Sequence, residues 1–223
     1  METRLSLTLD EFRAATNEVG RDGLTSLGLI LKPFIESNDR EWDRWESKTF
    51  RRLTRAQRAL VIWSTLARTS CNAAEHAYAY FENRVDAAHC GEVFSAIKSF
   101  DWPELTERFI RLFANCIGDP DRPKAAYEQW RKRERDERKK MHADIRKIAL
   151  QRTGQIVRDE HALDMFALHL ADAGELTLPE RNFDAAEDFA AWLKSPEVRN
   201  ESVVRIRSWM WKHQGELCIL RPG

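Results

Sequence analysis

Residues Leu53–Asn83 read LTRAQRALVIWSTLARTSCNAAEHAYAYFEN, and they are the strongest indication of how this chain folds. The segment opens with Thr54 and Gln57, which have the spacing of a capping box. Apolar residues then recur at steps of three and four, as on one face of a helix: Ala59, Leu60, Trp63, Leu66, Ala67, Cys71, Ala74, Ala77, Tyr78 and Phe81. A helix that is apolar on most sides is buried on most sides. We therefore expect a long central helix, with Trp63 and Leu66 almost completely buried.

The remainder of the chain also favours helices. Strand-like alternation of apolar and polar residues is nearly absent, and a second capping box, Thr8 with Glu11, predicts a helix that ends at Gly20. Pro103 occupies the first turn of another predicted helix, which carries a hydrophobic stripe from Leu105 onward. The sequence therefore predicts an all-α fold, an irregular multi-helix bundle around a long central helix.

We expect residues 1–223 to form a single helical domain. The chain is 43% hydrophobic and contains eight Trp and eleven Phe, which is enough to fill one core. Loops suggest a subdivision into N-terminal helices (1–50), core helices (54–151) and C-terminal helices (155–223). The clearest of these loops is Gly118–Pro123, and Gly154 is predicted to break the chain again.

Cysteine usage and hydrophobic run lengths indicate the compartment. None of the four cysteines, Cys71, Cys90, Cys116 and Cys218, belongs to a CxxC pair, so we expect buried free thiols in a reducing environment. The N-terminus lacks a basic segment followed by an apolar one. No apolar run approaches the ~20 residues of a membrane span. We therefore expect a cytoplasmic protein with no membrane partner.

The charges are neutral in sum but not in their distribution. Arg122–Arg158 contains thirteen Lys or Arg against five Asp or Glu, a net charge of +8, whereas Asp159–Asp188 contains nine acidic residues against one Arg, a net charge of −8. One interpretation is that these adjacent segments lie antiparallel and pair with each other. The other is that one or both meet a charged partner.

The segment Arg131–Lys140 contains no apolar residue, although Trp130 and Met141 flank it. Strong helix formers dominate it, so we predict an exposed helical rod. The rod would present cations to an anionic surface: Arg131, Arg135, Arg138 and Lys139. Acidic residues interrupt the run, which suits an acidic protein partner better than a phosphate backbone. Nucleic-acid binding by residues 131–140 is the less favoured alternative.

A helical metal-dependent enzyme is an alternative from another class. It would use two pairs at a spacing of three residues: His161 with Asp164, and His169 with Asp172. Such pairs can ligate metals in helical bundles. About 12 Å of helix axis separates the two pairs, so they cannot share one ion. We predict no metal ligand and no cofactor.

Nucleophilic catalysis has one candidate pair, the adjacent His89 and Cys90. No local signature supports it, and the chain contains no GxSxG, P-loop, GxGxxG or HExxH motif. We therefore predict no catalytic residue.

Residues 54–118 resemble a bacterial DNA-mimic-protein family of all-helical domains of unknown function. Arg58–Leu66 corresponds to the opening of the family's pattern, and Tyr80-Phe81-Glu82-Asn83 matches its Tyr-Phe-x-Asn end. Val93–Phe100 and Leu105–Phe113 resemble the two helices that follow. The family's Gly-Gly step and its overall acidity are absent here. The resemblance implies an α-helical binding module and carries over no catalytic residue.

These observations together predict a non-enzymatic module for protein–protein interaction that binds a charged partner surface and could serve in regulation.

Overall fold

The computed structural model describes residues 4–22, 30, 47–70, 80–81, 85–177 and 183–221. It confirms the all-α prediction: 77% of these described residues are helical, and they form ten helices and almost no strands. The helices are α1 (Leu9–Asp22), α3 (Lys48–Arg52), α4 (Arg55–Ser70), α6 (Cys90–Ser99), α7 (Pro103–Cys116), α8 (Pro123–Thr153), α9 (Glu160–Asp172), α10 (Asp184–Lys194), α11 (Pro196–Lys212) and α12 (Gln214–Leu217). Within the described ranges, no helix has the length and apolar character that a membrane span requires.

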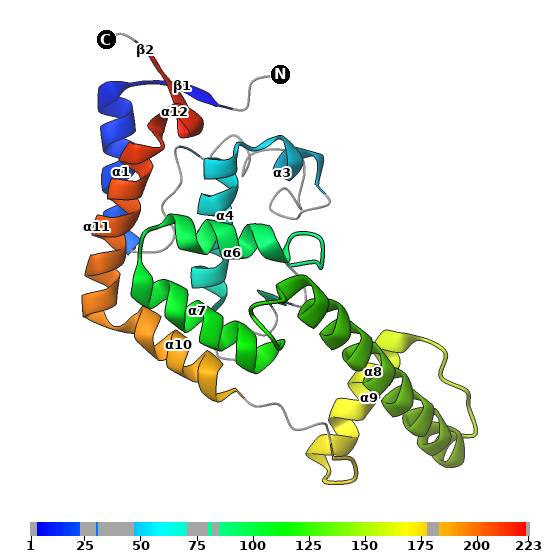
Figure 1. The fold of residues 1–223 in the computed structure, drawn as a ribbon. Coiled ribbons are helices and arrows are strands. Elements are labelled where there is room, and N and C mark those ends of the chain that lie inside the picture. Colours follow the sequence, from blue (N-terminus) through cyan, green and yellow to red (C-terminus); the bar gives the residue numbers. More distant parts are fainter. Residues whose placement is uncertain are drawn as a thin grey trace.

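Helix α4 lies inside the bundle and contacts α6, α10 and α12 (Figure 1). The predicted capping box starts it: the Thr54 N–H donates to Gln57 Oε1 at 2.9 Å, and the Gln57 N–H donates to Thr54 Oγ1 at 3.2 Å. Trp63 and Leu66 are 2% and 0% exposed, as predicted. Residues 71–79 of the predicted central helix lie outside the described part of the chain.

Aromatic side chains from α4, α10, α11 and the segment between α6 and α7 form one cluster. The Trp63 ring centroid lies 5.9 Å from that of Trp102, which precedes α7. Trp102 in turn lies 5.2 Å from Trp192 of α10, and Phe100 lies 4.8 Å from Trp209 of α11. Because aromatic rings bury a large area each, this cluster joins segments that are far apart in sequence into one core.

The two ends of the chain meet in a small parallel sheet that sequence reasoning missed. Strand β1 (Leu5–Thr8) pairs with β2 (Cys218–Arg221), with Leu5 opposite Cys218. The capping box of Thr8 and Glu11 forms as predicted, with the Thr8 N–H donating to Glu11 Oε2 at 2.7 Å. The prediction that Gly20 ends α1 is wrong, because the helix continues to Asp22. One glycine costs a helix only about 1 kcal/mol and need not stop it.

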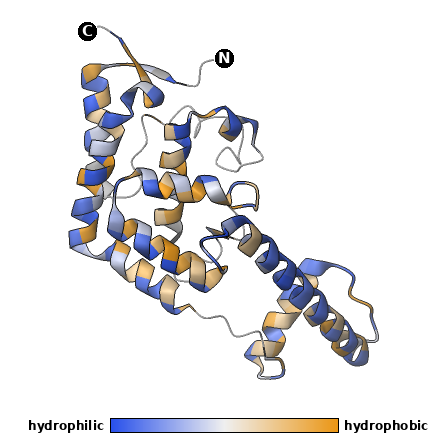
Figure 2. Cartoon of the chain, in the orientation of Figure 1, coloured by the Kyte–Doolittle hydropathy of each residue, from blue (hydrophilic) through white to orange (hydrophobic). Residues whose placement is uncertain are grey.

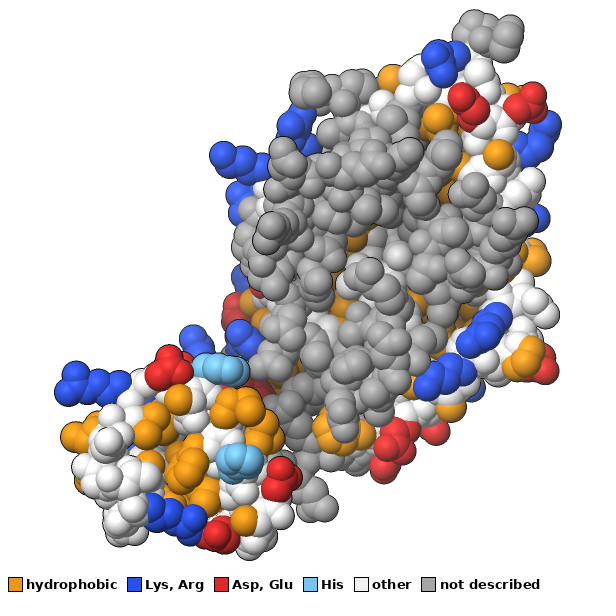
Figure 3. All heavy atoms as spheres, turned by 180° about the vertical axis from the view of Figure 1, so that it is seen from behind, with side chains coloured by type: hydrophobic (Ala, Val, Ile, Leu, Met, Phe, Trp, Pro, Cys, Tyr) orange, Lys and Arg blue, Asp and Glu red, His pale blue; other side chains and the backbone are white. Residues whose placement is uncertain are grey.

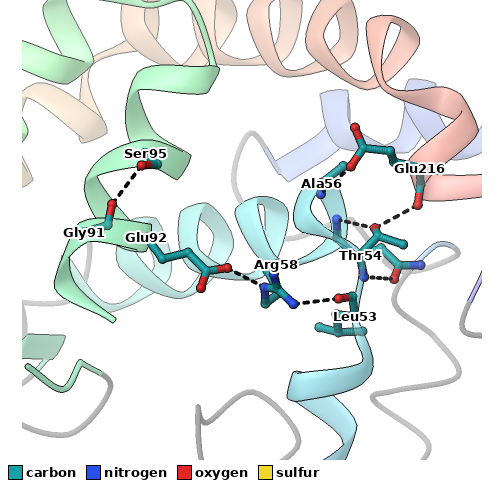
Figure 4. A network of polar contacts seen from close by, with 9 residues as sticks. Leu53, Thr54, Ala56, Arg58, Gly91, Glu92, Ser95 and Glu216 are labelled. Carbon is teal, nitrogen blue, oxygen red and sulfur yellow. Dashed lines mark hydrogen bonds and ion pairs between the residues drawn. The ribbon is translucent and has the colours of Figure 1, made fainter. Parts of the chain in front are cut away.

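Side chains and backbone at the start of α4 hold the C-terminal segment in place (Figure 4). Thr54 Oγ1 donates to the Glu216 carbonyl at 2.8 Å, and the Ala56 N–H donates to Glu216 Oε2 at 3.4 Å. Arg58 forms an ion pair with Glu92 of α6 and donates to the Leu53 carbonyl at 2.8 Å. The start of α4 is therefore tied to α6 and α12 at once.

Two hydrophobic clusters organise the described residues. The larger cluster includes side chains from both halves of the chain, such as Leu7, Leu66 and Trp209. The smaller cluster is centred on Ile145, Leu163, Ala167 and Leu170. Helix α8 leads away from the body of the molecule, and α9 crosses it near its far end (Figure 1). Residues 141–177, which surround the smaller cluster, are referred to below as the arm.

Candidate functional site

Helix α8 is the structural basis of the candidate site. Pro123 occupies its first turn, and Gly154 ends it in the left-handed region at φ 68°. Only glycine adopts that conformation without strain, and proline costs nothing where the helix N–H groups have no internal partner. The predicted loop at Gly118–Pro123 and the predicted break at Gly154 are both confirmed.

Each end of α8 is anchored by buried side chains. At its start, Tyr127 and Trp130 join the larger cluster. The Tyr127 hydroxyl lies 2.5 Å from the Val85 carbonyl and 3.0 Å from the Phe81 carbonyl, so it can donate to either. Toward its end, Ile145 belongs to the smaller cluster. The helix is thus fixed at two points that belong to different hydrophobic clusters.

Between these anchors, Arg131–Lys140 is helical throughout and contains no buried residue. Figure 2 shows the hydrophilic character of this part of α8. The prediction of an exposed helical rod is confirmed. The rod bridges the two hydrophobic clusters and contributes no residue to either of them.

The four predicted binding residues lie on one side of α8, but two of them already have partners within the chain. Arg131, Arg135 and Arg138 follow one another at steps of four and three, so they lie on one face of α8. Arg138 forms an ion pair with Asp164 of α9, and Arg135 Nε donates to the Arg131 carbonyl at 3.2 Å. The side chain of Lys139 is exposed and makes no hydrogen bond or ion pair with the described residues. Two of the three arginines on this face therefore already bind groups of the same chain, and Lys139 lies beside them.

His142 continues the arginine face one turn beyond Arg138, and sequence reasoning missed it. It is 3% exposed, and its Nε2 donates to Asp164 Oδ1 at 2.7 Å. Partial burial alone would raise the pKa of Asp164, but the hydrogen bonds from His142 and Arg138 and their positive charge hold that pKa below its ordinary value. The sequence did contain a signal for a buried histidine on this face: His142 lies four residues after Arg138 and next to the apolar Met141.

The basic segment Arg122–Arg158 and the acidic segment Asp159–Asp188 form some ion pairs with each other. Besides Arg138 with Asp164, Arg152 of α8 pairs with Glu175, which follows α9. From the first ion pair to the second, the residue number rises on α8 (138 to 152) and also on the acidic side (164 to 175). In antiparallel neighbours one number would fall, so the interpretation that the basic and acidic segments lie antiparallel is wrong. The linker of residues 155–159 returns the chain along α8 before α9 begins (Figure 1).

The proposed His and Asp pairs do not assemble into a metal centre. Asp164 of α9 contacts Arg138 and His142, which belong to α8. Its carboxylate is therefore bound by α8 and not paired with His161 of its own helix. His161 and His169 are exposed. Among the residues that the structure describes, no group of three or more His, Cys, Asp or Glu side chains is placed to hold a metal ion.

The described cysteines are buried, and burial raises the pKa of each thiol. Burial, together with the charges of Asp86 and Glu128, raises the pKa of Cys90 to about 12, and burial raises that of Cys116 to about 12. The neighbouring His89 is bound to Asp86 through Nδ1 at 2.7 Å. Because the thiolate is the nucleophile, the raised pKa of Cys90 disfavours nucleophilic catalysis by the pair of His89 and Cys90. The buried free thiols that we predicted are confirmed for Cys90, Cys116 and Cys218.

The described residues also form concave sites, two of which bear on binding. A pocket of about 200 Å³ between α4, α6, α11 and α12 is lined by Glu92 and Glu216, whose carboxylates already pair with Arg58 and the Ala56 N–H. A larger groove of about 630 Å³ lies where α8 begins, between its first turns and the loop that follows α7. Arg133 Nη2 donates to the carbonyl of Ile117 at 3.3 Å, which ties the loop to α8.

The arm also carries exposed hydrophobic side chains. The larger ones are Leu150, Ile156, Met165 and Leu168. Figure 3 shows hydrophobic side chains gathered on one side of the arm, with histidine side chains among them. The four buried residues of the smaller cluster are thus surrounded by apolar side chains that remain in contact with solvent.

Comparisons of the chain with known protein families, with curated proteins and with solved structures found no match. The resemblance of residues 54–118 to the DNA-mimic family therefore stays a prediction.

Proposed function

We propose that this protein is a non-enzymatic helical interaction module and that the exposed middle of α8 binds an acidic protein surface. The observation that carries the proposal is the segment Arg131–Lys140, which is helical, has no buried residue and is fixed at both ends. A surface held in place before binding loses little conformational freedom when a partner arrives.

The charges of this segment support a protein partner over a nucleic acid. Seven cations alternate with Glu134, Asp136 and Glu137 along ten residues. A phosphate backbone presents uninterrupted negative charge and would be repelled by these carboxylates. A protein surface can offer carboxylates to the cations and hydrogen-bond donors to the acids.

The exposed hydrophobic residues of the arm are a second support for an interaction role. Clusters of exposed apolar side chains commonly mark surfaces that bind another macromolecule. Here Met165 and Leu168, one turn apart on α9, are both exposed.

Fluorescence anisotropy with two labelled probes of similar charge tests the proposal: a glutamate-rich peptide and a single-stranded oligonucleotide. We expect the full chain to bind the peptide at low ionic strength. The variant Lys132→Glu/Lys139→Glu should lose most of this binding. The control Lys98→Glu/Lys194→Glu makes the same change of charge at exposed positions of α6 and α10 and should bind as the unmodified chain does.

Two outcomes contradict the proposal. Preferential binding of the oligonucleotide, with affinity that falls steeply as salt rises, would assign the basic segment to nucleic acid. Equal losses in both double variants would mean that the peptide responds to net charge rather than to α8.

A further inference from the structure

The groove at the start of α8 carries positive charge that no described carboxylate pairs with. Arg122 and Lys132, both exposed, line it, and their side chains make no hydrogen bond or ion pair with the described residues. Arg133 lines it as well, and it also holds the loop by donating to the Ile117 carbonyl. Two carboxylates, Asp119 and Asp136, stand among these cations. The lining therefore contains three cations and two carboxylates, a small excess of positive charge.

The wall and floor of the groove are formed before any ligand binds. Asp119 Oδ1 accepts from the Asp121 N–H at 2.9 Å, which fixes the turn beside the groove. Gly118 has φ 142°, a conformation that other residues rarely adopt. The apolar lining comes from Ile117 with Ala125 and Ala126, whose side chains are small. Short side chains at these positions leave space that a larger apolar side chain can fill.

The groove lies on the outward face of α8, away from the face that contacts α9. Ala125, Gln129, Lys132 and Asp136 follow one another at steps of four, three and four, so they form one stripe along the helix. Lys139 extends this stripe by three residues. The groove and the exposed rod thus form a continuous surface on one helix.

From this geometry we infer that the groove is the primary docking site for the acidic partner and takes an acidic peptide segment with one hydrophobic side chain. The inference rests on the proposed function and specifies its partner. The carboxylates of the segment pair with Arg122 and Lys132, and its hydrophobic side chain packs on Ala125. Asp119 and Asp136 disfavour a nucleic-acid strand in the same place.

The test uses the full chain and two labelled glutamate-rich peptides that differ only at a central residue, leucine or serine. The leucine peptide should bind more tightly. Ala125→Phe fills the groove without changing the charge, and we expect it to weaken binding of the leucine peptide roughly tenfold. Ala143→Phe is the matched control, because it adds the same side chain to the same face of α8 eighteen residues later, outside the groove.

A second pair of variants makes the test independent of the folding of Ala125→Phe. Arg122→Glu/Lys132→Glu reverses two groove cations, and Arg135→Glu/Lys139→Glu makes the same change of charge beyond the groove. Binding should fall roughly tenfold in the first variant and by a smaller factor in the second, because Arg135 and Lys139 belong to the exposed rod but do not line the groove. Circular dichroism and thermal unfolding confirm that each variant is folded.

The possible results separate the inference from the proposed function. If Ala125→Phe binds like the unmodified chain, or if both charge variants lose binding equally, the groove is not the docking site although α8 still binds acid. Equal affinity for the leucine and serine peptides would refute the apolar contact. If neither charge variant weakens binding, the peptide binds elsewhere and the proposed function itself fails.

Discussion

Replacing Leu66 by alanine tests whether α4 is the centre of the core. The side chain is 0% exposed and belongs to the larger hydrophobic cluster. The substitution removes three carbon atoms, which at about 0.8 kcal/mol per buried methylene corresponds to roughly 2.4 kcal/mol of lost transfer free energy. The cavity left behind adds to this, so the free energy of unfolding should fall by about 2–5 kcal/mol.

Urea unfolding followed by circular dichroism measures this loss, and the melting temperature should fall by roughly 5–15 °C for a domain of this size. Val204→Ala is the control, since Val204 lies on α11 and is 65% exposed. It should change the free energy of unfolding by less than about 0.5 kcal/mol. A loss below about 1 kcal/mol at Leu66, similar to that of the control, would refute the central position of α4.

Two further substitutions test the anchors of α8. Tyr127→Phe removes the hydroxyl that reaches the carbonyls of Val85 and Phe81, and it should lower the free energy of unfolding by about 1–3 kcal/mol, measured in urea; an unchanged value would mean that water replaces the hydroxyl. The pKa of Asp164 is lowered in the folded chain, so its contribution to stability is complete above the ordinary value of 3.8 and is lost as pH falls through the folded pKa. The protection of arm amides against hydrogen exchange, after correction for the pH dependence of the intrinsic exchange rate, should therefore fall on acidification below pH 3.8 more in the unmodified chain than in Asp164→Asn, and equal responses would contradict this role.

The sequence was sufficient to predict features that depend on neighbouring residues. Both capping boxes, the burial of Leu66 and the exposure of Arg131–Lys140 follow from spacing along one helix, and all are present. Gly20 shows the limit of such local reasoning, because the same residue type ends α8 at Gly154 but is accommodated inside α1. Packing around the helix decides between the two outcomes.

Features that join distant segments could not be predicted in this way. Strand β1 spans only four residues, and its partner lies at the other end of the chain. The pairing of Arg138 and His142 with Asp164 depends on how α9 crosses α8, and the linker that sets this crossing has no periodicity to read. The groove likewise needs the loop after α7 to stand beside α8.

The placement of α8 predicts that substitutions in its basic middle will leave the core unaffected. A helix segment that buries no side chain contributes little packing energy, so its residues need only favour a helix and remain soluble. Tyr127 at one end and Ile145 at the other fix its position through separate clusters. Charge reversals at Lys132 and Lys139 should therefore alter binding while leaving stability almost unchanged. That separation between binding and stability is what distinguishes an interaction surface from a structural ion-pair network, in which the same reversals would destabilise the fold.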